Sequence, residues 1–113
     1  MDAPNPHKIP YLRHMFLYNI TVVVEDEVRA VVRSKIEERI CLYTEGTVNL
    51  LELVNSPHEG TTYCIHLLAA NDAQIQQFQQ EHLTYLHELA NREYNGKVLF
   101  FDSTLKYLAD LSK

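Results

Sequence analysis

The chain has 113 residues, of which 46% are hydrophobic and 22% charged, and its formal net charge at pH 7 is −5. This length is typical of one domain and sufficient to bury a single core. The acidic balance, without any cluster of lysine and arginine, argues against nucleic acid as a partner, because phosphate binding draws on concentrated positive charge. No apolar run approaches the roughly 20 residues that a membrane-spanning helix needs. Two cysteines, Cys41 and Cys64, are too few for a disulfide framework, so we expect a reduced, cytoplasmic protein.

The N-terminal segment differs in composition from the rest of the chain. It holds three of the four prolines, which are Pro4, Pro6 and Pro10. Prolines at this density favour extended chain over a helix or a paired strand. We therefore predict a flexible tail over residues 1–14 and one domain over residues 15–113. The alternative is that the tail packs on the domain through three apolar side chains, Ile9, Tyr11 and Leu12.

The first predicted elements are a strand and a helix. Residues 15–24 are rich in β-branched and aromatic side chains, which is typical of a strand. The acidic run 25–27 then suits the first turn of a helix. Apolar residues recur at helical spacing after this run as far as Ile40, and the helix is expected to end before Gly46.

The next predicted elements are a hairpin and a long helix. Residues 48–55 and 61–70 are predicted to be antiparallel strands joined by a turn over 56–60, which contains a proline and a glycine. Asn71 or Asp72 is predicted to cap a helix that continues to about Glu93.

The chain is predicted to close with a strand and a short helix. The Asn95-Gly96 turn precedes a fourth strand over residues 97–102. A short helix over residues 103–111 is then expected, with Ser103 as its cap.

These elements follow the order β-α-β-β-α-β. Two right-handed crossovers joined by a hairpin give a ferredoxin-like α+β fold. In this fold two helices cover one face of a four-stranded antiparallel sheet with the spatial order 4-1-3-2.

A family resemblance supports the same fold. It is carried by the opening "YNITVVV", the hairpin "LLELVNSPHEGTTYCIHLL", the stretch "EHLTYLHELANREYNGKVLFF" and the trailing "STLKYL". From Met15 to about Leu108 the chain resembles a family of small bacterial proteins of unknown function, with a ferredoxin-like fold of the dimeric α+β barrel type. The resemblance implies a fold and no activity.

The alternation of side chains predicts what the second face of the sheet carries. We expect the helices to cover one parity of the first and third strands, which is Phe16, Tyr18, Ile20, Val22 and Val24 with Tyr63, Ile65, Leu67 and Ala69. On the second strand Leu51 and Leu53 are predicted to face the helices. The uncovered face is then predicted to combine apolar with polar side chains, namely Leu17, Val23, Val48, Leu50, Val54, Cys64, Leu68, Val98 and Phe100 with Asn19, Thr21, Glu52, His66 and Asp102.

An apolar patch of this extent exceeds what monomers normally leave exposed, so something is expected to cover it. A second copy packed sheet against sheet is the simplest cover, because closed symmetric dimers are the commonest assemblies. The tail, the C-terminal segment or another protein would be the alternative covers. The leading hypothesis is therefore a homodimeric module that binds a ligand or a protein partner and has no catalysis of its own.

The candidate ligand-binding residues are Asn19, Glu52, Cys64 and His66. Cys64 and His66 project from the same face of a strand, where they could form a site or merely line a packed interface. Neither a metal nor a cofactor is expected, because metal sites need three or four ligands and neither Cys-x-x-Cys nor His-Glu-x-x-His occurs.

The alternative function is a small dimeric α+β barrel enzyme, similar to a monooxygenase or an isomerase, with a pocket around His66, Asn19 and Glu52. Asn19 and His82 resemble the strand asparagine and helix histidine of heme-degrading monooxygenases. Those enzymes also use a tryptophan, and this chain has none.

Overall fold

The computed structural model describes residues 15–57, 59–109 and 111, so the predicted tail over residues 1–14 lies outside the described residues. The chain order is β1 (Phe16–Val24), a 3₁₀ turn η2 (Asp26–Val28), α1 (Arg29–Ile40), β2 (Val48–Glu52), β3 (Thr61–Ala69), α2 (Asp72–Phe78), a π-helical turn η3 (Gln79–Leu83), α3 (Thr84–Glu93) and β4 (Val98–Lys106).

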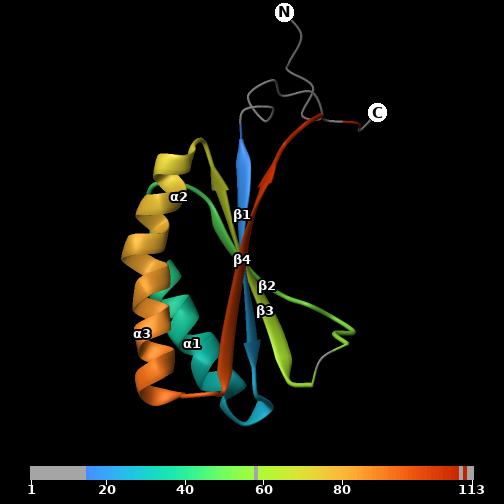
Figure 1. Cartoon of the computed structure of the whole chain (residues 1–113), viewed down its shortest axis with the longest axis vertical. Helices are drawn as coiled ribbons and strands as arrows, with labels where there is room; N and C mark the ends of the chain where they lie inside the picture. The colour runs from blue at the N-terminus through green and yellow to red at the C-terminus, as the bar shows by residue number, and fades with distance from the viewer. Residues whose placement is uncertain (1–14, 58, 110, 112–113) are drawn as a thin grey trace, which may run out of the picture.

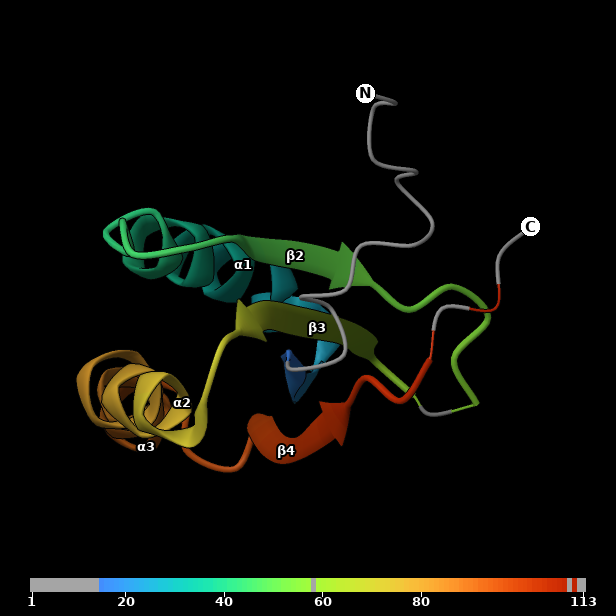
Figure 2. The same ribbon diagram turned by 90° about the horizontal axis from the view of Figure 1, so that it is seen from above.

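The strands form one four-stranded sheet in the order β2-β3-β1-β4, and every neighbouring pair is antiparallel. Both helical layers, α1 and the continuous α2-η3-α3, lie on the same side of this sheet (Figures 1 and 2). The predicted ferredoxin-like α+β fold is therefore confirmed. It leaves the second face of the sheet without a covering element among the described residues.

Local chemistry explains where the helices begin. Acidic side chains occupy η2, immediately before α1, where the positive end of the helix dipole favours them. Asn71 caps α2, since its side-chain oxygen accepts a hydrogen bond from the backbone N–H of Gln74 at 2.9 Å.

The core lies between the sheet and the helices. Phe78 of α2 is fully buried at its centre, and its ring meets those of Tyr18 and Tyr43 edge-on, with centroids 6.5 and 5.3 Å apart. Such edge-to-face pairs are favoured by the aromatic quadrupole. The sheet contributes the predicted side chains of β1 and β3, which are buried as expected except Phe16, which is partly buried.

The predicted helix over residues 103–111 is wrong, because β4 continues to Lys106 and no regular element follows among the described residues. Residues 103–106 pair with the first half of β1, from Asn19 back to Phe16. Without this pairing the backbone groups on that side of β1 would lack ladder partners, and such groups are costly to leave unpaired. Tertiary pairing thus overrides the local capping signal of Ser103.

The predicted facing of β2 is also wrong. Val48 and Leu50 pack against the core, in register with the core-facing residues of β3. Leu51 therefore faces away from the helices, and Leu53 continues its parity. Apolar side chains occupy both parities of this strand, so alternation alone does not identify the buried face.

The predicted facing of β4 is wrong in the same sense. Val98 and Phe100 pack against the core, and Asp102 shares their face, where it accepts a hydrogen bond from the hydroxyl of Tyr18. A carboxylate was expected to face outward, but this one lies at the exposed edge of the core and has a buried donor beside it.

Candidate functional site

The uncovered side of the sheet, hereafter the open face, consists of the alternate strand residues that point away from the helices. Their positions follow from the strand register and the burial of the intervening residues. They are Leu17, Asn19, Thr21 and Val23 of β1, Asn49 and Leu51 of β2, Thr62, Cys64, His66 and Leu68 of β3, and Leu99, Phe101, Ser103 and Leu105 of β4. None of these residues is Asp, Glu, Lys or Arg.

The register places the polar residues of the open face in a line across all four strands. Asn19 lies opposite His66 on one side and Ser103 on the other, and His66 lies opposite Asn49. We call these four residues the polar row. Apolar neighbours flank it: Leu17, Leu68 and Leu105 on one side, and Leu51, Cys64 and Phe101 with Thr21 on the other.

Large apolar side chains on the outer strands of this face are exposed. The exposed fraction is 60% for Phe101, 54% for Leu99, 52% for Leu105 and 44% for Leu51. Large apolar side chains exposed on both sides of the polar row, on a face without charged residues, are typical of an interaction surface rather than of a solvated one.

The structure brings three of the four predicted site residues together. Asn19 and His66 are directly opposite, and Cys64 lies in the adjacent row. Glu52 is not with them, because it lies opposite the buried Tyr63 on the helix side, where its negative charge contributes to the raised pKa of the Tyr63 phenol after the effect of burial.

Sequence reasoning missed Asn49 and Ser103, which complete the polar row. Asn49 has the same parity as Leu51, which the alternation predicts to face the helices. Ser103 is predicted to cap a helix rather than to continue β4. Because both predictions are wrong, neither residue was expected on the open face. Within the row, Asn19 donates to the Thr21 hydroxyl at 3.0 Å. Among the residues that the structure describes, none forms a hydrogen bond with the His66 imidazole.

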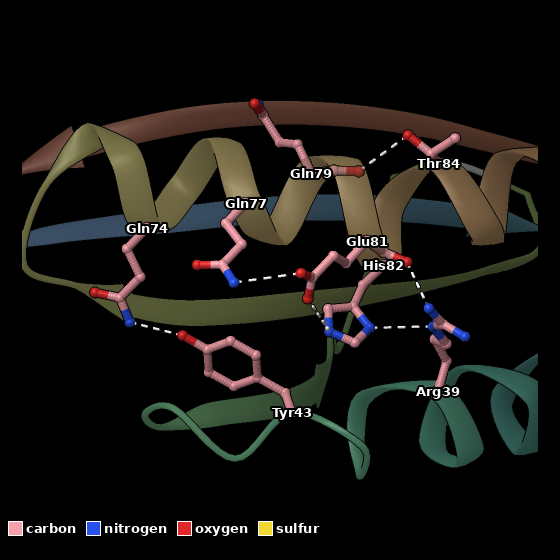
Figure 3. A network of polar contacts seen from close by, with 8 residues as sticks. All are labelled: Arg39, Tyr43, Gln74, Gln77, Gln79, Glu81, His82 and Thr84. Atoms are coloured by element: carbon pink, nitrogen blue, oxygen red, sulfur yellow. Dashed lines mark hydrogen bonds and ion pairs between the residues drawn. The ribbon is translucent and has the colours of Figure 1, made fainter.

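A second polar cluster, on the helix side, surrounds His82 of η3 (Figure 3). The Arg39 Nε donates to His82 Nδ1 at 3.1 Å, and an Arg39 terminal nitrogen donates to the Glu81 carbonyl at 2.6 Å. The Arg39 guanidinium also lies 4.3 Å from the ring centre of Tyr85. Because Nδ1 accepts this hydrogen bond, the neutral imidazole carries its own proton on Nε2, which lies 3.8 Å from a Glu81 carboxylate oxygen.

The π-helical turn η3 also connects the helical layer to the edge of the sheet. Its first residue, Gln79, donates to the hydroxyl of Tyr18 at 3.1 Å, and that hydroxyl donates to Asp102. Burial, together with the hydrogen bond to Asp102, raises the pKa of the Tyr18 phenol. The Thr84 hydroxyl donates to the Gln79 carbonyl at 3.1 Å, and the backbone N–H of Thr84 donates to the same oxygen in the π-helical pattern.

These contacts make the His82 cluster a structural connection between α1 and the π-helical turn. The imidazole is 5% exposed, and both of its nitrogens face protein groups. Asn19 and His82 do not form a pair like the asparagine and histidine of heme-degrading monooxygenases. Asn19 points away from the helices on the open face, whereas His82 is buried on the helix side of the sheet.

We expect His82 to make the stability of the protein depend on pH. Burial, followed by the positive charge of Arg39, lowers the pKa of His82 below its ordinary value of 6.5, against a smaller opposing effect of Glu81. The unfolded chain therefore binds this proton at a higher pH than the folded chain does. The contribution to the free energy of unfolding is fully present above pH 6.5 and is lost as the pH falls through the folded-state pKa.

Urea unfolding at a fixed protein concentration, followed between pH 5 and pH 8, measures this effect. His82→Gln keeps an acceptor for Arg39 and should reduce the pH dependence below 6.5. The control His87→Gln changes an exposed histidine on the same helix and should retain the wild-type dependence. Equal pH profiles for all three proteins would contradict this role of His82.

Within the described ranges, no three His, Cys, Asp or Glu side chains come together in a way that could hold a metal ion. No helix in the described part of the chain combines the length and the apolar character that crossing a bilayer requires.

The fold and the site define a small ferredoxin-like α+β domain with one covered and one open sheet face. The chain belongs to the family Domain of unknown function (DUF4286), whose model matches residues 15–108. No curated protein matches the sequence.

Solved structures show the same fold at low identity. The de novo designed protein Foldit4 has a TM-score of 0.50 and 11% identity, and the match covers 79% of this chain and 94% of that chain. A dabb family protein with a ferredoxin-like fold from Mesorhizobium loti has a TM-score of 0.48 and 14% identity, with 78% and 95% of the two chains covered. At these identities the likeness concerns the fold alone.

Proposed function

We propose that this protein is a homodimeric binding module in which the open faces of two copies pack against each other, and that it has no catalysis of its own. The observation that carries this proposal is the composition of the open face, which contains no Asp, Glu, Lys or Arg and presents exposed Leu99, Phe101 and Leu105. Interface cores are depleted in charge in this way.

The driving force is sufficient for association. Removing about 400–600 Å² of apolar area from each copy contributes on the order of 20–30 kcal/mol at about 25 cal/mol per Å². Association costs about 4–15 kcal/mol, with further terms for side-chain ordering and for desolvation of polar groups. A second copy is the favoured occupant because a two-fold interface places the same uncharged surface on both sides.

The polar row gives the interface its binding chemistry. Two asparagines, a histidine and a serine supply neutral donors and acceptors between apolar rows. Between two packed sheets these groups either bond to the partner's row or to a small neutral ligand, because a buried ion would find no opposite charge on this face. The alternative of an enzyme pocket around His66, Asn19 and Glu52 lacks one of its members, since Glu52 lies on the helix side.

Native mass spectrometry of the full chain tests the proposal. We expect a particle of twice the 13.1 kDa chain mass at micromolar concentration, either unliganded or with a small molecule that His66→Ala releases without dissociating the dimer. A protein that remains monomeric throughout a concentration series would contradict the proposed function.

A further inference from the structure

Two segments extend from the sheet on the side of the open face, at opposite ends of the strands. One is the loop between β2 and β3, and the other is the segment that follows β4 (Figures 1 and 2). The loop leaves the sheet where Leu53 pairs with Thr62, which lies beside Val23 near the end of β1. The segment after β4 leaves it beside the start of β1.

The loop begins with two apolar residues, Leu53 at its base on the sheet and Val54 immediately after it. Val54 is 73% exposed and Leu53 is 46% exposed, and Asn55 turns the chain in the left-handed region with a φ of 56°. The residues from 53 to 57 include no charged side chain. Aliphatic side chains held in solvent beside a defined turn are suited to insertion into an apolar depression.

The opposite end of the open face carries such a depression. It is a hollow of about 390 Å³ whose lining is mainly apolar, formed by Leu17, Leu105, Tyr107, Leu108, Ala109 and Leu111 together with the charged Lys106. Leu108 and Leu111 are more than four-fifths exposed, so the lining is poorly covered in a single copy. Leu17 and Leu105 belong to the open face as well, and the hollow is therefore continuous with it.

The area of the sheet shows what these two features would add to an interface formed by the open faces. Strands of nine residues at a spacing of about 4.8 Å, with a shorter β2, give the open face a footprint of about 500 Å². A stable interface usually buries about 800 Å² on each partner. Apolar contacts beyond the flat part of the face would supply the difference.

We infer that the β2–β3 loop of each copy inserts Leu53 and Val54 into the hollow of the partner. This inference rests on the proposed homodimer. A two-fold axis that lies between the faces and runs across the strands exchanges the two ends of the sheet. When this axis is oblique to the strands, the same rotation also brings the β2–β3 corner of one copy over the β1–β4 corner of the other, where the hollow lies. Both contacts then form together, and each hollow is complete only in the dimer.

Mixed single-cysteine chains test this contact. One chain carries Val54→Cys and the other Leu108→Cys, and both also carry Cys41→Ser and Cys64→Ala. The two proteins are mixed so that their dimers exchange subunits, and the mixture is then mildly oxidised. We expect a disulfide between the two chains, identified by peptide mapping. The matched control replaces Leu108→Cys with Leu42→Cys, an exposed leucine at the C-terminal end of α1 on the helix side, and should give no such product.

A charge in the loop gives a second test in the otherwise natural chain. Val54→Asp should raise the dimer dissociation constant by about tenfold or more, since each interface loses two buried aliphatic contacts. Leu42→Asp should leave it unchanged. A dimer with unaltered affinity in Val54→Asp and no cross-link above the control would overturn this inference alone, whereas a monomeric wild-type chain would overturn it together with the proposed function.

Discussion

Replacing Phe101 with aspartate is expected to convert the proposed homodimer to a monomer. Phe101 lies in the middle of β4 on the open face and is 60% exposed in one copy. Burying a phenylalanine contributes about 1.5–3 kcal/mol, and a two-fold interface contains the residue twice. The loss corresponds to an increase of the dissociation constant of about 100- to 10,000-fold, before the cost of burying a carboxylate is added.

Sedimentation velocity over a concentration series measures this change, with Leu42→Asp as the matched control. Leu42 is 62% exposed, like Phe101, but lies just after α1 on the helix side. Both variants should keep the wild-type circular dichroism spectrum, since neither residue is in the core. If Phe101→Asp dissociates no more readily than Leu42→Asp, the open face is not the dimer interface.

Gly60→Ala is expected to cause the largest loss of stability at any glycine of this chain. Gly60 joins the β2–β3 loop to β3 with a φ of +85°, and a Cβ atom there would lie 2.4 Å from the carbonyl oxygen of Val24. The left-handed conformation costs an L-residue about 1–2 kcal/mol. Forcing the backbone of β1 away from the new methyl group adds about 1–3 kcal/mol.

Gly96→Ala separates these two effects. Gly96 has a similar φ of +78°, but its Cβ would meet nothing within 4 Å. We therefore expect a loss of only about 1–2 kcal/mol at this position, and a clearly larger loss for Gly60→Ala, both measured by urea unfolding at one protein concentration. Equal losses would show that contact with Val24 does not constrain the loop.

Much of the fold could be predicted because the local signals agree with the tertiary structure. β1 has one parity that is entirely apolar, so its buried side is evident, and Asn71 marks the start of α2 by its capping chemistry. The order of the elements then fixes the connectivity of the sheet, since the handedness of crossovers leaves few alternatives.

The open face could be predicted only in part. β2 and β4 have apolar residues in both parities, and the choice between them depends on pairing with β3 and β1 rather than on the strand itself. Asp102 misled the assignment of β4, because its partner Tyr18 is distant in sequence. Correcting these facings moves both Glu52 and Asp102 to the helix side, which leaves the open face without any carboxylate.

The π-helical turn is a further feature that periodicity does not reveal. Residues 72–93 were expected to form one continuous helix, and η3 interrupts it at residues 79–83. A π-helical turn adds only one residue to the helix, so the spacing of apolar residues in the sequence hardly changes. In the structure Gln79 of this turn points toward Tyr18, and His82 points toward Arg39.

The rate at which a maleimide labels Cys64 tests the burial of the open face most directly, since a mass alone does not locate a contact. Cys64 lies partly buried on this face, and the exposed Cys41 on the helix side serves as an internal reference. In the wild-type protein at concentrations where it is dimeric, Cys64 should react many times more slowly than in Phe101→Asp, while Cys41 reacts equally in both. Equal rates for Cys64 in the two proteins would contradict the proposal that a second copy covers the open face.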